Sequence, residues 1–209
     1  MSAVTRDPTS TRRASGLSRL KIVRIGRPVS HAELAILGEQ VLRPFARRLR
    51  SVRLLDYRSP GVERIEADLL TQALDQDVGG HILGVTDADL LDVSGGEFFP
   101  FMFGCKDRRN DVAVVSTRRL AALDPGRTLA RLLKVALHEL GHNFGLVHHY
   151  AFVPAIDGAY CPMTKGDYNR HGERSYRRAV IDARGRRFCS RCSRFLRLTG
   201  AEPTQPAPA

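Results

Sequence analysis

Apolar side chains recur along the chain with two spacings, one typical of strands and one typical of helices. Residues 19–25 alternate between apolar and basic side chains, which predicts a strand. From residue 34 to residue 42 the apolar positions follow helical spacing, and Ser30 and Glu33 stand before them at the positions of a capping box. We therefore expect a helix that begins after Ser30 and extends to about Arg50.

The same alternation of strands and helices continues through the middle of the chain. Further helical spacing spans residues 65–73, and a longer apolar face begins after Asp124 and Pro125 and reaches Phe144. Short apolar runs predict strands at residues 51–55, 81–86 and 111–116. Because strands and helices alternate before the long helix, the pattern predicts an α/β (α+β) domain with a mixed, twisted sheet.

An aromatic run precedes the last of these strands. Pro100 interrupts it, and proline confines a strand to the edge or the start of a sheet because it has no backbone N–H to donate. Two interpretations remain open, an edge strand of the sheet and ordinary packing in the core. The run consists of Phe98, Phe99, Phe101, Met102 and Phe103.

Length and composition indicate a single domain. The chain has 209 residues, of which 43% are hydrophobic, enough for one core. We expect a domain at residues 19–198 between disordered tails at residues 1–18 and 199–209, with an irregular C-terminal subregion at residues 146–198. The sequence contains no run of 18 apolar residues and no apolar signal segment, so we expect a cytoplasmic protein without membrane contact.

The net charge of +11 is distributed unevenly. Residues 1–58 and 164–209 are basic, with net charges of +9 and +7, whereas residues 59–104 carry a net charge of −8. Contact with nucleic acid or another polyanion is one interpretation. We favour an arginine-rich solvated surface, because the basic residues lack interleaved aromatic side chains that could stack on bases. Nucleic acid stays open as a partner.

The most informative stretch runs from His138 to His148 and reads H-E-x-x-H-x-x-G-x-x-H. His138 and His142 are four residues apart, so they project from one face of a helix. Gly145 can adopt the positive φ that ends a helix, and the turn brings His148 back toward the other two. Three imidazoles can hold one Zn²⁺ and leave a fourth position for water, which is the arrangement of a catalytic zinc site.

Glu139 directly follows the first of these histidines. Its carboxylate can take a proton from a water held at the fourth position, which is the role of a general base. The alternative is a helix with surface histidines, but a motif with this many fixed positions favours the zinc site.

Two further motifs lie downstream, and with the histidine motif they resemble the archaemetzincins, a family of the metzincin metallopeptidases. Cys161-Pro162-Met163 reads C-x-M, and Cys189 and Cys192 form C-x-x-C. The resemblance extends from about Leu20 to about Phe195. There are two departures. His149 stands where the family has a cysteine, and the connections to the later cysteines are longer.

The resemblance implies a metzincin-like fold with a long active-site helix and an irregular, zinc-stapled C-terminal part. It also implies that Met163 lies under the catalytic zinc as the Met-turn. Cys189 and Cys192 have the spacing of a zinc knuckle, and the resemblance adds further ligands for a second, structural zinc. The expected ligands of that zinc are His149, Cys161, Cys189 and Cys192, with Cys105 or another histidine in reserve for His149. The rival interpretation leaves Cys189 and Cys192 as free thiols or a redox pair.

These observations lead to a zinc-dependent metallopeptidase with two Zn²⁺ per chain, one catalytic and one structural. His138, His142 and His148 are the expected ligands of the catalytic zinc, and Glu139 is the expected general base. The substrate is a peptide or protein. The resemblance implies peptide hydrolysis, with aminopeptidase activity as one form, and the sequence does not decide between N-terminal trimming and internal cleavage. The alternative function is a zinc-stapled basic module that binds nucleic acid with little or no catalysis.

Overall fold

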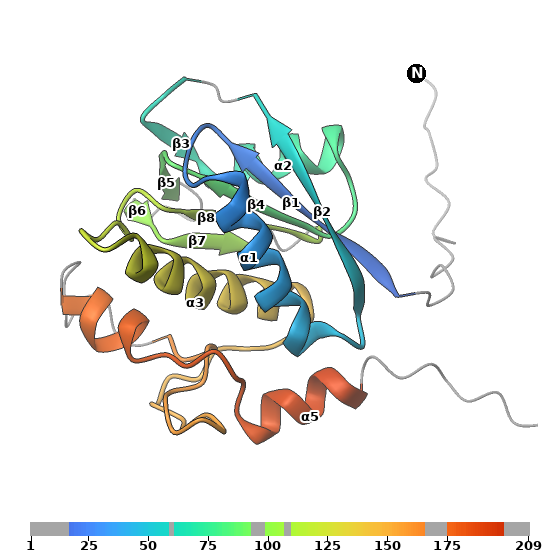
Figure 1. The fold of residues 1–209 in the computed structure, drawn as a ribbon, viewed down its shortest axis with the longest axis vertical. Helices are drawn as coiled ribbons and strands as arrows, with labels where there is room; N and C mark the ends of the chain where they lie inside the picture. Colours follow the sequence, from blue (N-terminus) through green and yellow to red (C-terminus); the bar gives the residue numbers. More distant parts are fainter. Residues whose placement is uncertain (1–16, 59–60, 93–98, 107–109, 166–174, 199–209) are drawn as a thin grey trace, which may run out of the picture.

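A five-stranded sheet in the order β2-β1-β4-β8-β7 organises the structure, a computed structural model that describes residues 17–58, 61–92, 99–106, 110–165 and 175–198 (Figure 1). Four of its strands run parallel, and the last pairs antiparallel with its neighbour. The five strands are β1 (Ser18–Ile25), β2 (Leu49–Tyr57), β4 (Ile82–Thr86), β8 (Val112–Ser116) and the antiparallel β7 (Gly104–Lys106). Both β4 and β8 are buried along their whole length, which explains why they are almost continuously apolar.

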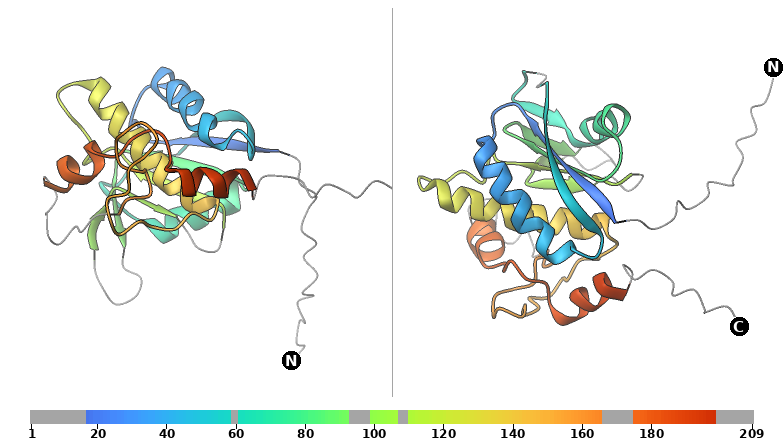
Figure 2. Two further views of the ribbon diagram at one scale, coloured as in Figure 1. Left: turned by 90° about the horizontal axis from the view of Figure 1, so that it is seen from below. Right: turned by 45° about the vertical axis from the view of Figure 1, so that its right-hand side comes forward.

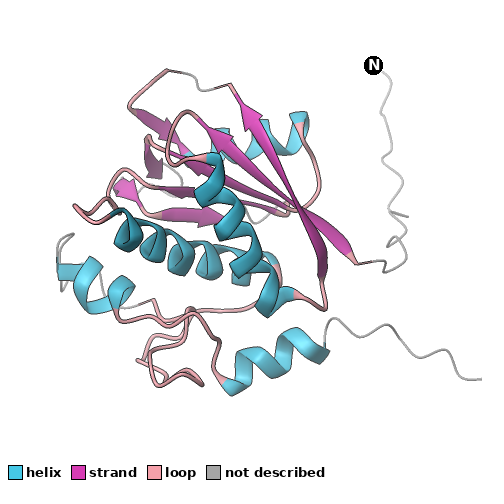
Figure 3. Ribbon diagram, in the orientation of Figure 1, coloured by secondary structure: helices cyan, strands magenta, loops and turns pink. Residues whose placement is uncertain are grey.

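Helices cover both faces of this sheet, and β1 shows how the side chains are divided between them (Figures 1 and 3). Successive side chains of a strand point to opposite faces. Leu20 and Ile22 join the larger apolar core, together with residues of α1 (His31–Leu42) and α3 (Pro125–Asn143). Val23 and Ile25 join the smaller core on the other face, where α2 (Ala67–Asp77) packs.

A smaller sheet of three strands stands beside the first, in the order β3-β5-β6. Its strands are β3 (Arg64–Glu66), β5 (Asp89–Asp92) and β6 (Phe99–Met102). The aromatic run of the sequence therefore begins in β6, which pairs with β5, and the edge of the five-stranded sheet is the following strand, β7. Phe98 lies outside the described residues. The partly buried Phe103 packs against the larger core, so packing explains that part of the run.

The chain after α3 crosses the side of α3 that faces away from the sheet (Figures 1 and 2). It is mostly loop, with a π-helical turn η3 (Arg177–Asp182) and a helix α5 (Ser190–Leu198). Asp182 fastens this segment to α3, because its carboxylate lies 2.8 Å from Nε of Arg131 and its carbonyl accepts from Nζ of Lys134 at 2.6 Å. The Arg131 guanidinium holds the pKa of Asp182 at about 2.

The predicted α/β (α+β) class is confirmed, and the main correction concerns the first helix. The capping box at Ser30 is present, but α1 ends at Leu42 and does not reach Arg50. A 3-10 turn, η1 (Arg43–Phe45), follows, and β2 begins at Leu49. Pro44 explains the early end, because proline lacks the N–H that a continuing helix would need.

Two further sequence predictions can be compared with the described residues. Helix α5 was not predicted, since residues 146–198 were expected to be mostly irregular. The predicted tails at residues 1–18 and 199–209 lie outside the described residues except for Leu17 and Ser18, and Ser18 already belongs to β1. In the part of the chain that the structure covers, no helix is long and apolar enough to span a membrane.

Candidate metal centres and active site

The end of α3 is shaped to bring three histidines together. At its start, the side chain of Asp124 accepts a hydrogen bond from the backbone N–H of Gly126. At its end, Gly145 has φ +86°, and the N–H groups of Gly145 and Leu146 donate to the carbonyls of His142 and Gly141. These two hydrogen bonds form a Schellman motif, which requires a residue with positive φ. The reversal places His148 opposite the helical pair.

The three histidine side chains meet at their Nε2 atoms. Nε2 of His138 lies 3.3 Å from Nε2 of His142 and 3.2 Å from Nε2 of His148, and the remaining pair is 2.9 Å apart. Two of the rings are held through their other nitrogen. Nδ1 of His138 lies 2.8 Å from the carbonyl of Pro162, and Nδ1 of His142 lies 2.8 Å from the carbonyl of Leu146. The group of His138, His142 and His148 is called the histidine group below.

The hydrogen bonds of this group fit a metal site. A carbonyl accepts only from a protonated nitrogen, so Nδ1 carries the hydrogen in His138 and His142, and each Nε2 presents a lone pair. Lone pairs facing each other at this distance repel unless a cation lies between them. Zn²⁺ bound tetrahedrally to imidazole at ~2.0–2.1 Å needs nitrogen atoms about 3.3 Å apart, close to the observed separations. Carbonyls that orient metal-binding imidazoles are a usual outer shell of such sites.

Glu139 is buried beside the histidine group, with 7% of its surface exposed. Its side chain lies against Gly104 of β7. A Cβ added at Gly104 would be 2.7 Å from Cγ of Glu139, so only glycine leaves room for the carboxylate there. Burial raises the pKa of Glu139 to about 8, and the positive charge of Arg184 opposes this shift. A cation on the histidine group would act in the same direction as Arg184. It would lower the pKa of Glu139 and favour the ionised form that a base requires.

The segment Cys161-Pro162-Met163 connects the histidine group to a second group of ligand-type residues. The carbonyl of Pro162 orients His138, as described above. Met163 is fully buried under α3, and a Cβ added at Gly141 would lie 2.5 Å from its Sδ. Met163 thus lies below the helical turn that carries two of the histidines, where the resemblance expects the Met-turn. Cys161 points into the second group.

The second group consists of His149, Cys161, Cys189 and Cys192, whose ligand atoms all lie within 4.8 Å of one another. Nε2 of His149 is 3.2 Å from Sγ of Cys192 and 3.5 Å from Sγ of Cys189. The Sγ atoms of Cys161 and Cys192 are 4.0 Å apart. Below, these residues are called the cysteine group. The reserve ligand Cys105 lies in β7 and does not belong to it.

These separations fit a tetrahedral metal better than a disulfide. A disulfide requires sulfur atoms at ~2.05 Å, about half the distance between Cys161 and Cys192. Zn–S bonds of ~2.3 Å in a tetrahedron place the sulfurs about 3.8 Å apart. His149 and His148 can serve different groups because neighbouring side chains of an extended chain point to opposite sides. A bridge between His149 and Thr164 holds the chain extended there.

Two residues near Glu139 were missed in the sequence analysis. Arg184 is buried, with its Nε donating to the carbonyl of Thr164 at 2.8 Å, and its charge acts on both Glu139 and Cys161. Tyr176 is also buried, and its hydroxyl donates to the carbonyl of Lys165. Both come from a region rich in arginine with little apolar periodicity, so no pattern marked them. Their places are decided by the folding of η3 against α3.

Comparison with known proteins gives relatives of one kind. No family model matches the chain. An archaemetzincin from Aeropyrum pernix is 37% identical over 122 residues, which is 57% of this chain and 55% of that protein. The chain thus spans about half the length of the curated relatives it matches.

Solved structures extend the likeness to most of the fold. The crystal structure of an archaemetzincin from Methanopyrus kandleri has a TM-score of 0.65 and 25% identity, covering 90% of this chain and 98% of that one. The crystal structure of a zinc-dependent peptidase from Methanocorpusculum labreanum has a TM-score of 0.60 and 20% identity, covering 85% of this chain and 99% of that one. In both sequence and fold, this chain is similar to the archaemetzincins.

Proposed function

We propose that this protein is a zinc metallopeptidase whose active site is the histidine group together with Glu139. The observation that carries the proposal is the convergence of three Nε2 atoms within 3.3 Å beside a buried carboxylate. Zn²⁺ held there would polarise the scissile carbonyl and lower the pKa of a water toward ~7. The relationship to archaemetzincins and to a protein named as a zinc-dependent peptidase supports the same chemistry.

Different residues orient the metal-binding histidines and transfer the proton. Pro162 and Leu146 fix the ring orientation of two histidines through their carbonyls. Glu139 takes the proton of the attacking water and returns it to the leaving amine. Its burial against Gly104 holds the carboxylate in one place, which supports efficient proton transfer.

Strand β7 supplies a place for an extended peptide. One of its edges pairs with β8, and no other strand among the described residues pairs with it in the five-stranded sheet. An extended peptide can add to such an edge through backbone hydrogen bonds. Because Gly104 of β7 touches Glu139, a peptide bound along β7 would pass next to the proposed base.

The charges around the histidine group favour internal cleavage over removal of an N-terminal residue. Burial is the main cause that lowers the pKa of His142, and the positive charges of Arg184, Lys106 and Lys165 lower it further. Positive charge attracts a carboxylate of the substrate and repels its α-amino group. We therefore expect cleavage next to acidic residues to be faster than aminopeptidase activity, and an unbiased peptide library measures both.

The test is hydrolysis of that library by purified protein and by Glu139→Ala. We expect Glu139→Ala to lower kcat/KM by about 10²–10⁴-fold, because a positioned general base contributes that much. The metal content of the histidine group should not change, since Glu139 is not one of its ligands. Glu39→Ala, which removes an exposed glutamate on α1, is the matched control. Full activity in Glu139→Ala would refute the assigned base, and loss of the metal would make Glu139 a support of the site. A wild-type protein without peptidase activity would favour the alternative function, a zinc-stapled basic module that binds nucleic acid.

A further inference from the structure

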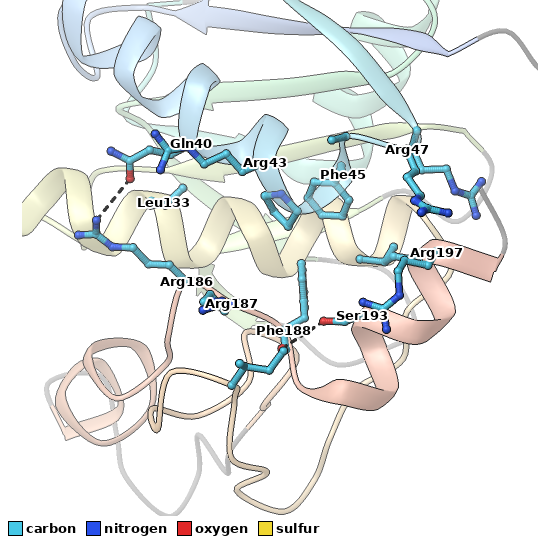
Figure 4. Close-up of a pocket in the computed structure, with 15 residues that line it drawn as sticks. Gln40, Arg43, Phe45, Arg47, Leu133, Arg186, Arg187, Phe188, Ser193 and Arg197 are labelled. Atoms are coloured by element: carbon cyan, nitrogen blue, oxygen red, sulfur yellow. Dashed lines mark hydrogen bonds between the residues drawn. The ribbon is translucent and has the colours of Figure 1, made fainter. Parts of the chain in front are cut away.

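A strongly basic pocket of about 720 Å³ lies between the end of the first helix and the segment that leads into α5 (Figure 4). One wall comes from η1 and the residues after it, and the other comes from residues 186–197. Among the described residues, no acidic side chain lines it. Six arginines do, three from each wall: Arg43, Arg47, Arg48, Arg186, Arg187 and Arg197.

The floor of the pocket is apolar and closed. Phe45, Leu133, Phe188 and Leu196 line it, and each is between 1% and 4% exposed. The rings of Phe45 and Phe188 meet edge to face, with centroids 5.6 Å apart. The two rings are therefore used in packing and offer no open face on which a nucleic-acid base could stack. Recognition in this pocket must come from the arginines.

The six arginines lack anionic partners within the described part of the chain, where none of the ion pairs includes them. Arg186 lies 3.5 Å from the amide oxygen of Gln40, a neutral group. Nε of Arg48 is fully buried without a hydrogen-bond partner, and its guanidinium lies over the ring of Phe144 at 5.7 Å. A cleft lined by charges of one sign, with no carboxylate paired to them, raises the local concentration of ions of the opposite sign, so these arginines would attract an anion from solution.

We propose that this pocket binds a small anion that carries several phosphate groups. The planar guanidinium fork matches phosphate oxygens in pairs, and arginine is preferred over lysine where such recognition matters. The volume is that of a small-molecule site. The closed apolar floor favours a compact ligand over a polynucleotide, which would gain from stacking. The chain's own residues 199–209 contain a single acidic residue, Glu202, and cannot neutralise six arginines.

The proposed phosphate site is separate from both metal groups, although the fold connects it to one of them. None of the six arginines belongs to the histidine group or the cysteine group. Arg186 and Arg187 precede Cys189 closely, and Arg197 follows Cys192 on α5. One wall of the pocket and two residues of the cysteine group therefore belong to the same stretch of chain. Binding can be measured without any assay of peptide hydrolysis.

The test is calorimetric titration of the full chain, loaded with zinc, with inositol trisphosphate at physiological salt. Zinc content is measured before and after, because phosphates chelate the metal. We expect one ligand per chain, and at least tenfold weaker binding in both Arg43→Gln/Arg47→Gln and Arg187→Gln/Arg197→Gln, which alter opposite walls. Arg191→Gln/Arg194→Gln is the matched control, since it removes the same charge from exposed positions of α5 outside the pocket. Circular dichroism establishes that each variant is folded.

Further ligands separate the sources of the anion. We expect a nucleoside triphosphate to bind as tightly as inositol trisphosphate and to lose affinity equally in both wall variants. This result supports a site that recognises the phosphate groups alone. Orthophosphate and a hexaglutamate peptide should bind at least tenfold more weakly. The proposal is overturned by the absence of saturable binding or by equal loss in the control variant. It is equally overturned by tighter binding of hexaglutamate, or of oligothymidylate with affinity that rises with its length.

Discussion

The histidine group and the cysteine group begin at adjacent residues, His148 and His149, but they depend on different parts of the fold. Two members of the histidine group stand on α3, a helix whose apolar face packs against the sheet. The cysteine group joins residues from loops and from the region of Cys189 at the start of α5. The segment that carries the cysteine group also packs on α3, because Val180, Ile181 and Phe188 belong to the same apolar core. Metal bound by the cysteine group would add folding free energy to that packing.

The two groups also differ in the number of ligands that they offer. The histidine group offers three ligands and lies beside Glu139, whereas the cysteine group offers four ligands and its cysteines are buried. Three ligands leave a position for a reacting water, and four ligands close a site. The short segment from Cys161 to Met163 touches both groups, so a disturbance of one is expected to reach the other through it.

The largest expected effect comes from replacing His148 or its neighbour His149 by alanine, one in each variant. His148→Ala should remove metal from the histidine group and lower kcat/KM by more than 100-fold, beyond the ~10–100-fold that loss of an outer hydrogen-bond partner costs. His149→Ala should leave that metal in place and weaken the cysteine group. Zinc analysis and peptide hydrolysis of both variants test this. Normal activity in His148→Ala would show that another residue is the third ligand of the metal, and His149 would be the first to examine.

The next prediction concerns the cysteine group. Wild-type protein should contain two zinc ions per chain, and Cys189→Ser/Cys192→Ser should contain one, measured by atomic emission on reduced protein. The C-terminal segment should then become sensitive to limited proteolysis, because its metal no longer offsets the entropy of ordering it. Cys105→Ser is the matched control and should keep both metals. A single zinc in the wild type, with both thiols titrating freely under native conditions, would contradict a metal in this group.

Gly141→Ala tests the contact between α3 and the segment that joins the two groups. The new methyl group would meet Sδ of the fully buried Met163 at 2.5 Å, so the segment must shift. We expect a loss of about 1–3 kcal/mol in the free energy of unfolding, as for other overpacked cores. Denaturant unfolding measures it. Gly126→Ala in the first turn of α3 is the control, since the nearest atom to its Cβ would be Oδ1 of Asp124 at 3.3 Å, an exposed side chain. Equal stability of the two variants would show that the contact is not tight.

The smallest expected effect is a loss of stability of the metal-free protein in acid. Burial lowers the pKa of His138, His142 and His148, the last to about 4, so the folded protein keeps these imidazoles neutral. The unfolded chain binds protons at its histidines below a pKa of ~6.5, and the free energy of unfolding therefore falls as the pH drops through 6.5 toward 4. Glu139, with a raised pKa, opposes this with a single proton.

Melting temperatures in chelator at several pH values measure this dependence. His148→Gln should flatten the dependence between pH 6.5 and 4, because it removes one of the three buried imidazoles. Greater stability at pH 5 than at pH 7 in the wild type would contradict the burial of the three imidazoles.

The sequence by itself determined most of the sheet and the identity of both groups. Strand positions at β1, β4 and β8 follow from apolar patterning, since a buried strand has few acceptable residues. The spacing of His138, Glu139, His142, Gly145 and His148 is local, and a helix with a glycine-dependent end converts it directly into geometry. The C-x-x-C spacing indicated Cys189 and Cys192 as metal ligands. Only the resemblance added His149 and Cys161 to them.

Tertiary structure alone decided the features that depend on contacts between distant segments. Arg184 and Tyr176 reach Glu139 because η3 docks on α3 through Asp182, and no local pattern encodes that docking. The aromatic run forms an edge strand, as its proline predicts, but β6 is the edge of the smaller sheet and β7 is the edge of the five-stranded sheet, because β6 pairs with β5 and β7 pairs with β8. Six arginines far apart in sequence form one pocket only after η1 and α5 are brought together. Local spacing fixes which side chains share a face, whereas long-range packing fixes which faces meet.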